Sequence, residues 1–83
     1  MYYLYVLFCN ERRSFYVGST RDLRRRIAEH KRGDVFTTRN STWRLVYYEA
    51  YLTEKAARNR EKRLKNHGRS KQLLLKRILE SLE

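Results

Sequence analysis

Residues 2–9, YYLYVLFC, and residues 15–18, FYVG, are the stretches that decide the fold. The first is rich in aromatic and apolar side chains, and it is apolar on both of its alternating faces. This pattern is typical of a central strand that is covered on both sides. Residues 10–14 between the two stretches are polar and predict a turn, so we expect the strands to form an antiparallel hairpin.

The predicted register of this hairpin places Tyr5 opposite Tyr16. The neighbouring pairs are then Tyr3 with Gly18 and Leu7 with Ser14. Opposed side chains of such a pair lie about 5 Å apart on the same face. Two adjacent phenols can therefore serve one small site, or both can be half-buried strand tyrosines with their hydroxyls in water. The spacing alone leaves both interpretations open.

Gly18 is a candidate nucleic-acid-binding position. A glycine inside a strand often marks the close approach of a ligand or of another backbone. Gly18 also comes just before a predicted helix, and the free N–H groups at a helix N-terminus favour a phosphate. The alternative interpretation is a glycine that simply serves a bulge or a turn.

The first helix is predicted by the spacing of Leu23, Ile27 and His30. We expect Thr20 to be its N-cap and Gly33 to end it. The segment that follows is rich in hydroxyl groups and is predicted to be a loop that ends at residue 42.

The rest of the chain predicts a third strand over residues 43–51 and two further helices. We expect Thr53 to cap a helix that runs to about Lys65, and Ser70 to cap the last helix. The last helix has an apolar stripe made of Leu74, Leu75, Ile78, Leu79 and Leu82. The element order ββαβαα predicts an α+β fold with a small three-stranded, mostly antiparallel sheet flanked by helices. We expect residues 1–83 to form a single domain.

Charge is the strongest signal in the composition. The 83 residues include 20 Lys and Arg against 9 Asp and Glu, which gives a formal net charge of +11. This balance favours a polyanionic partner such as nucleic acid. No apolar run approaches the roughly 18 residues that a membrane span needs, so we expect no membrane partner. Cys9 is the single cysteine, which fits a reducing cytoplasm. We expect no small-molecule cofactor, and the sequence leaves the oligomeric state open.

Basic residues on the first helix are candidates for contacts with phosphates. Arg24 and Arg25 have few acidic neighbours and are expected to be solvated or to touch the backbone of a nucleic acid. Thr38 and Arg39 in the loop are further candidates for phosphate contacts. Arg26 differs, because it lies four residues before His30 and the two side chains project from one helix face. A guanidinium beside an imidazole can hold a phosphate and move a proton.

Glu61 is the informative carboxylate of the second helix. It shares a helical face with Ala57 and Leu64, whereas the neighbouring basic residues point elsewhere. A carboxylate on an apolar face is costly unless it is paired or binds a metal ion. The sequence predicts either a metal ligand or a salt bridge to an arginine.

These residues occur in the order of the GIY-YIG nuclease family, which the chain resembles over nearly its whole length. Residues 3–5, YLY, stand where that family has Gly-Ile-Tyr, and residues 16–18, YVG, stand at its Tyr-Ile-Gly. Arg26 matches the catalytic arginine of the family, His30 a position held by His or Tyr, and Glu61 the metal-binding glutamate. The resemblance is closest to the small single-domain members, which are related to the N-terminal domain of the excision-repair nuclease.

Two features depart from the family pattern. Tyr3 replaces the glycine of the first motif, although the motif's tyrosine is kept as Tyr5. The late asparagine of larger members has no clear counterpart, because Asn66 follows too soon after Glu61.

The resemblance implies hydrolysis of phosphodiester bonds in DNA, or in RNA, with one Mg²⁺ or Mn²⁺ ion held by Glu61 and a role in DNA repair. Magnesium keeps several waters, so one protein carboxylate is sufficient. Arg26 would hold a phosphate oxygen, and Tyr5 would activate the attacking water with the help of His30. Tyr16 would orient the water or the phosphate, and the roles of the two tyrosines and His30 are open to exchange. A basic nucleic-acid binder without catalytic activity is the alternative function.

Overall fold

The computed structural model describes residues 1–33 and 42–82, and its sheet is built around the apolar N-terminal strand. Strand β1 lies between the other two strands in the order β2-β1-β3, and both pairs are antiparallel. This confirms the predicted α+β fold and the order ββαβαα. The elements are β1 (Tyr2–Cys9), β2 (Ser14–Thr20), α1 (Leu23–Lys31), β3 (Trp43–Tyr51), α2 (Glu54–Asn66) and α3 (Gly68–Leu82).

The predicted register of the β1–β2 hairpin is wrong by two residues. Tyr5 lies opposite Gly18, and Tyr16 lies opposite Leu7. Tyr3 is therefore paired with Thr20 instead of Gly18, and Ser14 is paired with Cys9. The turn is shorter than predicted, because pairing continues to Cys9 and Ser14. A shift of two residues keeps every side chain on its face, so both tyrosines still face the same side of the sheet.

The short turn is explained by the residues at the end of the hairpin. Phe8 lies opposite Phe15, and their ring centroids are 4.9 Å apart. Arg13 has a φ of 52°, which lets the chain reverse within residues 10–13. The observed register sets the two aromatic rings directly opposite each other, which is a favourable cross-strand pair.

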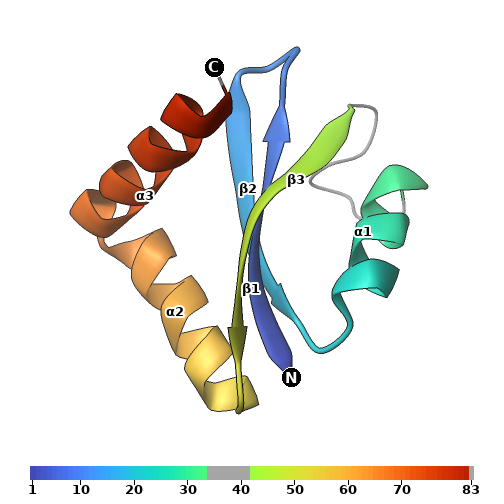
Figure 1. The fold of residues 1–83 in the computed structure, drawn as a ribbon, viewed down its shortest axis with the longest axis vertical. Coiled ribbons are helices and arrows are strands. Elements are labelled where there is room, and N and C mark those ends of the chain that lie inside the picture. The colour runs from blue at the N-terminus through green and yellow to red at the C-terminus, as the bar shows by residue number, and fades with distance from the viewer. Residues whose placement is uncertain (34–41, 83) are drawn as a thin grey trace.

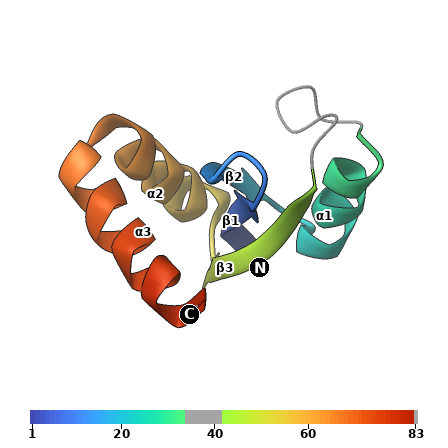
Figure 2. The same cartoon turned by 90° about the horizontal axis from the view of Figure 1, so that it is seen from above.

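Both faces of the sheet are covered, as the apolar character of β1 predicts. Helices α2 and α3 lie on one side of the sheet and α1 lies on the other (Figures 1 and 2). Leu4 and Val6 of β1 point to the side of α2 and α3, where they pack with Leu64, Leu74 and Ile78. The intervening residues of β1 point to α1 and form a second cluster made of Tyr5, Leu7, Cys9, Trp43, Tyr16, Leu23 and Ile27.

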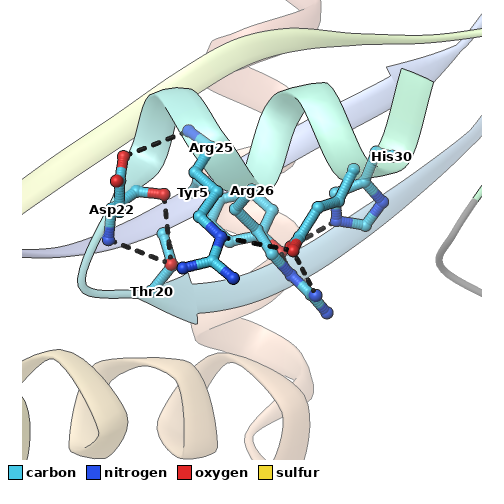
Figure 3. A network of polar contacts seen from close by, with 7 residues as sticks. Tyr5, Thr20, Asp22, Arg25, Arg26 and His30 are labelled. Carbon is cyan, nitrogen blue, oxygen red and sulfur yellow. Dashed lines mark hydrogen bonds and ion pairs between the residues drawn. The ribbon is translucent and has the colours of Figure 1, made fainter. Parts of the chain in front are cut away.

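The start of α1 differs from the sequence prediction. Asp22 is the N-cap, and its Oδ1 accepts a hydrogen bond of 3.1 Å from the backbone N–H of Arg25 (Figure 3). Thr20, which we expected to be the cap, is still part of β2, and its hydroxyl oxygen accepts from the N–H of Asp22. Gly33 follows the end of the helix as predicted, with a φ of 77° that favours glycine.

The C-terminal helices follow the predicted pattern except at one boundary. Thr53 caps α2 as expected and accepts a hydrogen bond from the N–H of Ala56. Helix α3 begins at Gly68 and not after Ser70, so that only His67 separates it from α2. Leu74 and Ile78 of the apolar stripe are buried against the sheet. In the described part of the chain, no helix is long and apolar enough to cross a membrane.

Candidate active site

Tyr5 is the centre of a polar network between β1 and α1. Its side chain is buried, with 1% of the residue exposed. The hydroxyl lies 2.9 Å from Nε2 of His30 and 3.3 Å from Nε of Arg26. Figure 3 shows both partners reaching down from α1 to the tyrosine. Arg26 and His30 project from one face of α1 as predicted, and Tyr5 of β1 joins them by hydrogen-bonding to both side chains.

The direction of these hydrogen bonds follows from the chemistry of the partners. The Nε of Arg26 can only donate, so the oxygen of Tyr5 accepts from it. The single proton of Tyr5 is then donated to Nε2 of His30, which requires a neutral imidazole protonated on Nδ1. Burial and the positive charge of Arg26 lower the pKa of His30 below its usual 6.5, which keeps the ring neutral at pH 7.

The same burial makes Tyr5 a weak acid. Desolvation raises the pKa of Tyr5 to about 12, although the hydrogen bond from Arg26 acts in the opposite direction. The hydrogen bond from Arg26 to Tyr5 also raises the pKa of Arg26, so its guanidinium stays charged. Tyr5 therefore does not ionise on its own near neutral pH. It can take up a proton only as its own proton passes to His30.

Gly18 is the backbone partner of Tyr5 across the hairpin, and the tyrosine ring lies over it. A Cβ atom at position 18 would be 2.6 Å from the hydroxyl oxygen of Tyr5 and 2.7 Å from its Cζ. The close approach that the sequence indicated is thus made by Tyr5. Contact of Gly18 with a nucleic acid stays a prediction.

Tyr16 extends the network towards the edge of the sheet. Its ring centroid lies 6.3 Å from that of Tyr5, 5.0 Å from His30 and 6.5 Å from Trp43. A hydrogen bond with Tyr16 also contributes to the raised pKa of Arg26. The structure therefore brings the two motif tyrosines together on one face, although they are not directly opposed.

Glu61 reaches the same edge from the opposite side of the sheet. Ser19 of β2 donates its hydroxyl to Oε1 of Glu61 at 2.5 Å, and Nζ of Lys65 lies 2.7 Å from Oε2. The same ammonium lies 6.0 Å from the centroid of the Tyr16 ring. The negative charge of Glu61 contributes to the raised pKa of Tyr5. The sequence also allowed a salt bridge from Glu61 to an arginine, and the structure shows that salt bridge with Lys65 instead.

The state of Glu61 suits a metal ligand. Burial, the largest single influence, raises its pKa, but the hydrogen bonds from Lys65 and Ser19 outweigh burial and leave the pKa below the usual value. Its carboxylate is therefore ionised, and 23% of its side chain is exposed. The positively charged ammonium of Lys65 already lies at Oε2 of this carboxylate. Residues 1–33 and 42–82 contain no group of three or more His, Cys, Asp or Glu side chains that could hold a metal ion. This donor set fits a magnesium ion that keeps most of its waters.

Sequence reasoning missed three polar contacts of this site. Glu29 forms an ion pair of 3.1 Å with Arg26, and Ser19 and Lys65 both bind Glu61. The spacings of three and four residues along the helices signal two of these pairs. Only the tertiary structure shows the contact of Ser19, because 42 residues separate it from Glu61.

The predicted phosphate-binding residues of α1 are exposed. Arg24 and Arg25 line an open groove beside α1, together with Tyr3 and Tyr48 from the sheet. The rings of these two tyrosines have an edge-to-face arrangement with centroids 6.1 Å apart, and Tyr48 is 55% exposed. Thr38 and Arg39 lie outside the described residues.

The chain is similar to known proteins in sequence and in fold. The chain matches the GIY-YIG catalytic domain over residues 1–74. A UPF0213 protein of Haloquadratum walsbyi is 35% identical over 72 residues, which cover 84% of this chain and 80% of that protein. A UPF0213 protein of Staphylococcus aureus is 33% identical, with 89% and 92% of the two chains covered. The solution NMR structure of a UPF0213 protein from Bacillus halodurans has a TM-score of 0.54 and 32% identity, covering 89% of this chain and 83% of that one.

The chain therefore belongs to the GIY-YIG family, and its relatives are UPF0213 proteins, a small group within that family. The resemblance drawn from the tyrosine motifs is confirmed. The GIY-YIG domain points to the nuclease superfamily, in which nucleic-acid binding and dependence on a divalent metal are general properties.

Proposed function

We propose that this protein is a metal-dependent endonuclease that hydrolyses phosphodiester bonds, with single-stranded or structured DNA as its substrate. The observation that carries the proposal is that two sets of polar groups contact strand β2, one at Gly18 and the other at Ser19. Tyr5, Arg26 and His30 form a proton-transfer and anion-binding network on one face. Glu61 presents an ionised carboxylate from the other face. Hydrolysis of a phosphodiester needs both a proton acceptor and charge neutralisation.

Arg26 is the residue we assign to the scissile phosphate. Its side chain is 35% exposed, and its Nε and Nη1 atoms are held by Tyr5 and Glu29. This double anchoring fixes the plane of the guanidinium before substrate binds. A fixed cation offsets the charge that develops on the phosphate oxygens without reorganising in the transition state.

The attacking water loses its proton through Tyr5 to His30. As the tyrosine oxygen accepts the proton of the water, its own proton moves to Nε2 of His30, and the tyrosine ends the step neutral. The imidazole is neutral and accepts from the tyrosine, so it is ready to receive this proton. The relay avoids a free tyrosinate, which the raised pKa of Tyr5 disfavours. Tyr16, beside His30, orients the water or the phosphate.

Glu61 is the residue that would hold the Mg²⁺ or Mn²⁺ ion. When bound there, the ion supplies Lewis-acid stabilisation of the phosphate and of the departing 3′-oxygen. Ser19 fixes the rotamer of Glu61 by donating to Oε1. This leaves Oε2, where Lys65 now lies, as the oxygen that faces a cation.

DNA would bind along the basic surface of α1. Arg24 and Arg25 supply phosphate contacts, and the exposed ring of Tyr48 supplies a face on which an unpaired base can stack. Stacking requires bases that are not paired, which favours a single strand or a structured junction over plain duplex.

The decisive test is Glu61→Gln. The glutamine keeps the shape and can still accept from Ser19, but it removes the charge that anchors the metal. We expect cleavage of labelled DNA in Mg²⁺ to fall at least ~100-fold, because a main source of electrostatic stabilisation is lost. Binding to DNA without metal should be equal or slightly tighter, since a negative charge is removed.

The matched control is Glu54→Gln on the same helix. Glu54 also pairs with a basic residue four positions on, Arg58, and the substitution removes the same charge away from the site. Its cleavage rate should match the wild type, and its melting temperature should fall by only a few degrees, because Glu54 lies in the first turn of α2. Cleavage by folded Glu61→Gln protein at the wild-type rate would refute the active site. Binding without any cleavage by the wild type would favour the non-catalytic binder.

A further inference from the structure

Lys65 is a site residue to which the family motifs give no role. It lies on α2 one turn after Glu61, and its ammonium is 2.7 Å from Oε2. The ammonium also lies over the ring of Tyr16 at 6.0 Å. It therefore stands between the carboxylate and the tyrosine cluster, where the substrate phosphate and the metal would meet.

The position of Lys65 conflicts with a metal on Glu61. Ser19 donates to Oε1 and the ammonium of Lys65 lies on Oε2, so a metal ion bound to this carboxylate would lie close to the ammonium. Two cations on one carboxylate repel each other strongly at such short range. Half of the Lys65 side chain is exposed, and its flexible four-carbon stem allows the ammonium to leave without moving the helix.

We propose that Lys65 and the metal ion occupy Glu61 in turn, and that the displaced ammonium then holds a phosphate of the bound DNA. In the metal-free protein Lys65 neutralises the carboxylate. Metal binding releases the lysine beside Tyr16, where it becomes available to the substrate. This exchange rests on the proposed function for the metal at Glu61. The exchange predicts that Lys65 lowers the affinity of Glu61 for the metal ion but raises the affinity of the protein for DNA. A lysine with only a structural role would change both affinities in the same direction.

The first measurement is the affinity for Mn²⁺ without DNA. The electron paramagnetic resonance signal of free Mn²⁺ is titrated against wild type, Lys65→Gln, Lys62→Gln and Glu61→Gln. Loss of Lys65 should lower the Kd for Mn²⁺ by roughly three- to tenfold, because the competing cation is gone. Lys62→Gln removes the same charge from an exposed position next to Glu61 and should change the Kd by less than about twofold. Melting curves check that each variant is folded.

The second measurement is the salt dependence of DNA binding with Ca²⁺, chosen as a probe that is not expected to support cleavage, and with a chelator. With Ca²⁺ bound, Lys65→Gln should reduce the slope of log affinity against log salt by about 0.7 to 0.9, which is one phosphate contact. With the chelator the slopes of wild type and variant should be equal, because Lys65 then remains on Glu61.

The outcomes separate this exchange from the function on which it rests. Equal Mn²⁺ affinity of wild type and Lys65→Gln, with binding lost in Glu61→Gln, overturns the exchange and leaves the metal site standing. Weaker Mn²⁺ binding by Lys65→Gln also overturns it and makes Lys65 a support for Glu61. Absence of Mn²⁺ binding in both proteins at millimolar metal overturns the metal centre itself.

Discussion

Replacing Gly18 by alanine tests whether the tyrosine network depends on the bare backbone of β2. The added Cβ would lie 2.6 Å from the hydroxyl oxygen of Tyr5 and 2.7 Å from its Cζ. Both separations are shorter than any van der Waals contact, so the ring must move. Tyr5 is 1% exposed and is held by His30 and Arg26, and it cannot shift without breaking those hydrogen bonds.

The expected loss of folding stability in Gly18→Ala is large for a domain of this size. Overpacking a well-filled site costs about 1–3 kcal/mol. Losing the hydrogen bonds of Tyr5 to His30 and Arg26 adds about 1 kcal/mol each. A total of about 3–5 kcal/mol compares with an unfolding free energy of about 4–12 kcal/mol for 83 residues. At about 4–8 °C per kcal/mol, the melting temperature of Gly18→Ala should fall by at least ~12 °C.

Thermal melts followed by circular dichroism provide the assay. The control is Gly68→Ala, because a Cβ at position 68 meets no atom within 4 Å and the glycine begins a helix. That substitution should leave the melting temperature unchanged or raise it. In a Tyr5→Leu background the shorter side chain removes the clash, so Gly18→Ala should then cost less than about 1 kcal/mol. A Gly18→Ala protein that melts within ~2 °C of the wild type would refute this account of the site.

Two further predictions concern α1. Because the pKa of His30 is lowered, the unfolded chain gains a proton near pH 6.5 that the folded protein does not bind. The free energy of unfolding should therefore decrease as the pH falls from about 7 through 6.5 towards the pKa of His30 in the folded protein. The decrease should be smaller in His30→Asn. A wild-type melting temperature that does not change between about pH 7.5 and 5 would contradict this. Arg26→Lys keeps the charge but cannot reproduce the fork that binds Tyr5 and Glu29, so kcat should fall ~100-fold while DNA affinity changes less than about threefold. An unchanged kcat measured on the same DNA would remove Arg26 from the proposed mechanism.

The fold was largely predictable because periodicity and turn residues specify it. The apolar character of residues 2–9 predicts their central place in the sheet, and the third strand and both C-terminal helices follow from similar patterns. The register of the hairpin did not follow from these patterns. It depends on the pairing of Phe8 with Phe15 and on a positive φ at Arg13, neither of which local preferences reveal. The N-cap of α1 was predicted at Thr20 and lies at Asp22, because Thr20 is part of β2.

The candidate site was predictable only in part. Motif spacing picks out the two tyrosines, Arg26 and Glu61, and helical spacing brings His30 to Arg26. The pKa directions could not be anticipated, because they depend on burial in three dimensions. The sequence leaves open whether Tyr5 or His30 is the base that activates the water. Burial raises the pKa of Tyr5 to about 12, and for this reason our proposal makes His30 the final proton acceptor.

The alternation of side chains along β2 explains how so small a chain can combine these groups. Tyr16 and Gly18 face α1, whereas Ser19 points to the opposite side and binds Glu61 of α2. Successive residues of a strand must point in opposite directions, so an edge strand can hold an aromatic network on one face and a carboxylate on the other. In a central strand the two faces would be separated by neighbouring strands. The edge position of β2 leaves its outer side open, and under the function proposed above this is the side from which a substrate phosphate would approach.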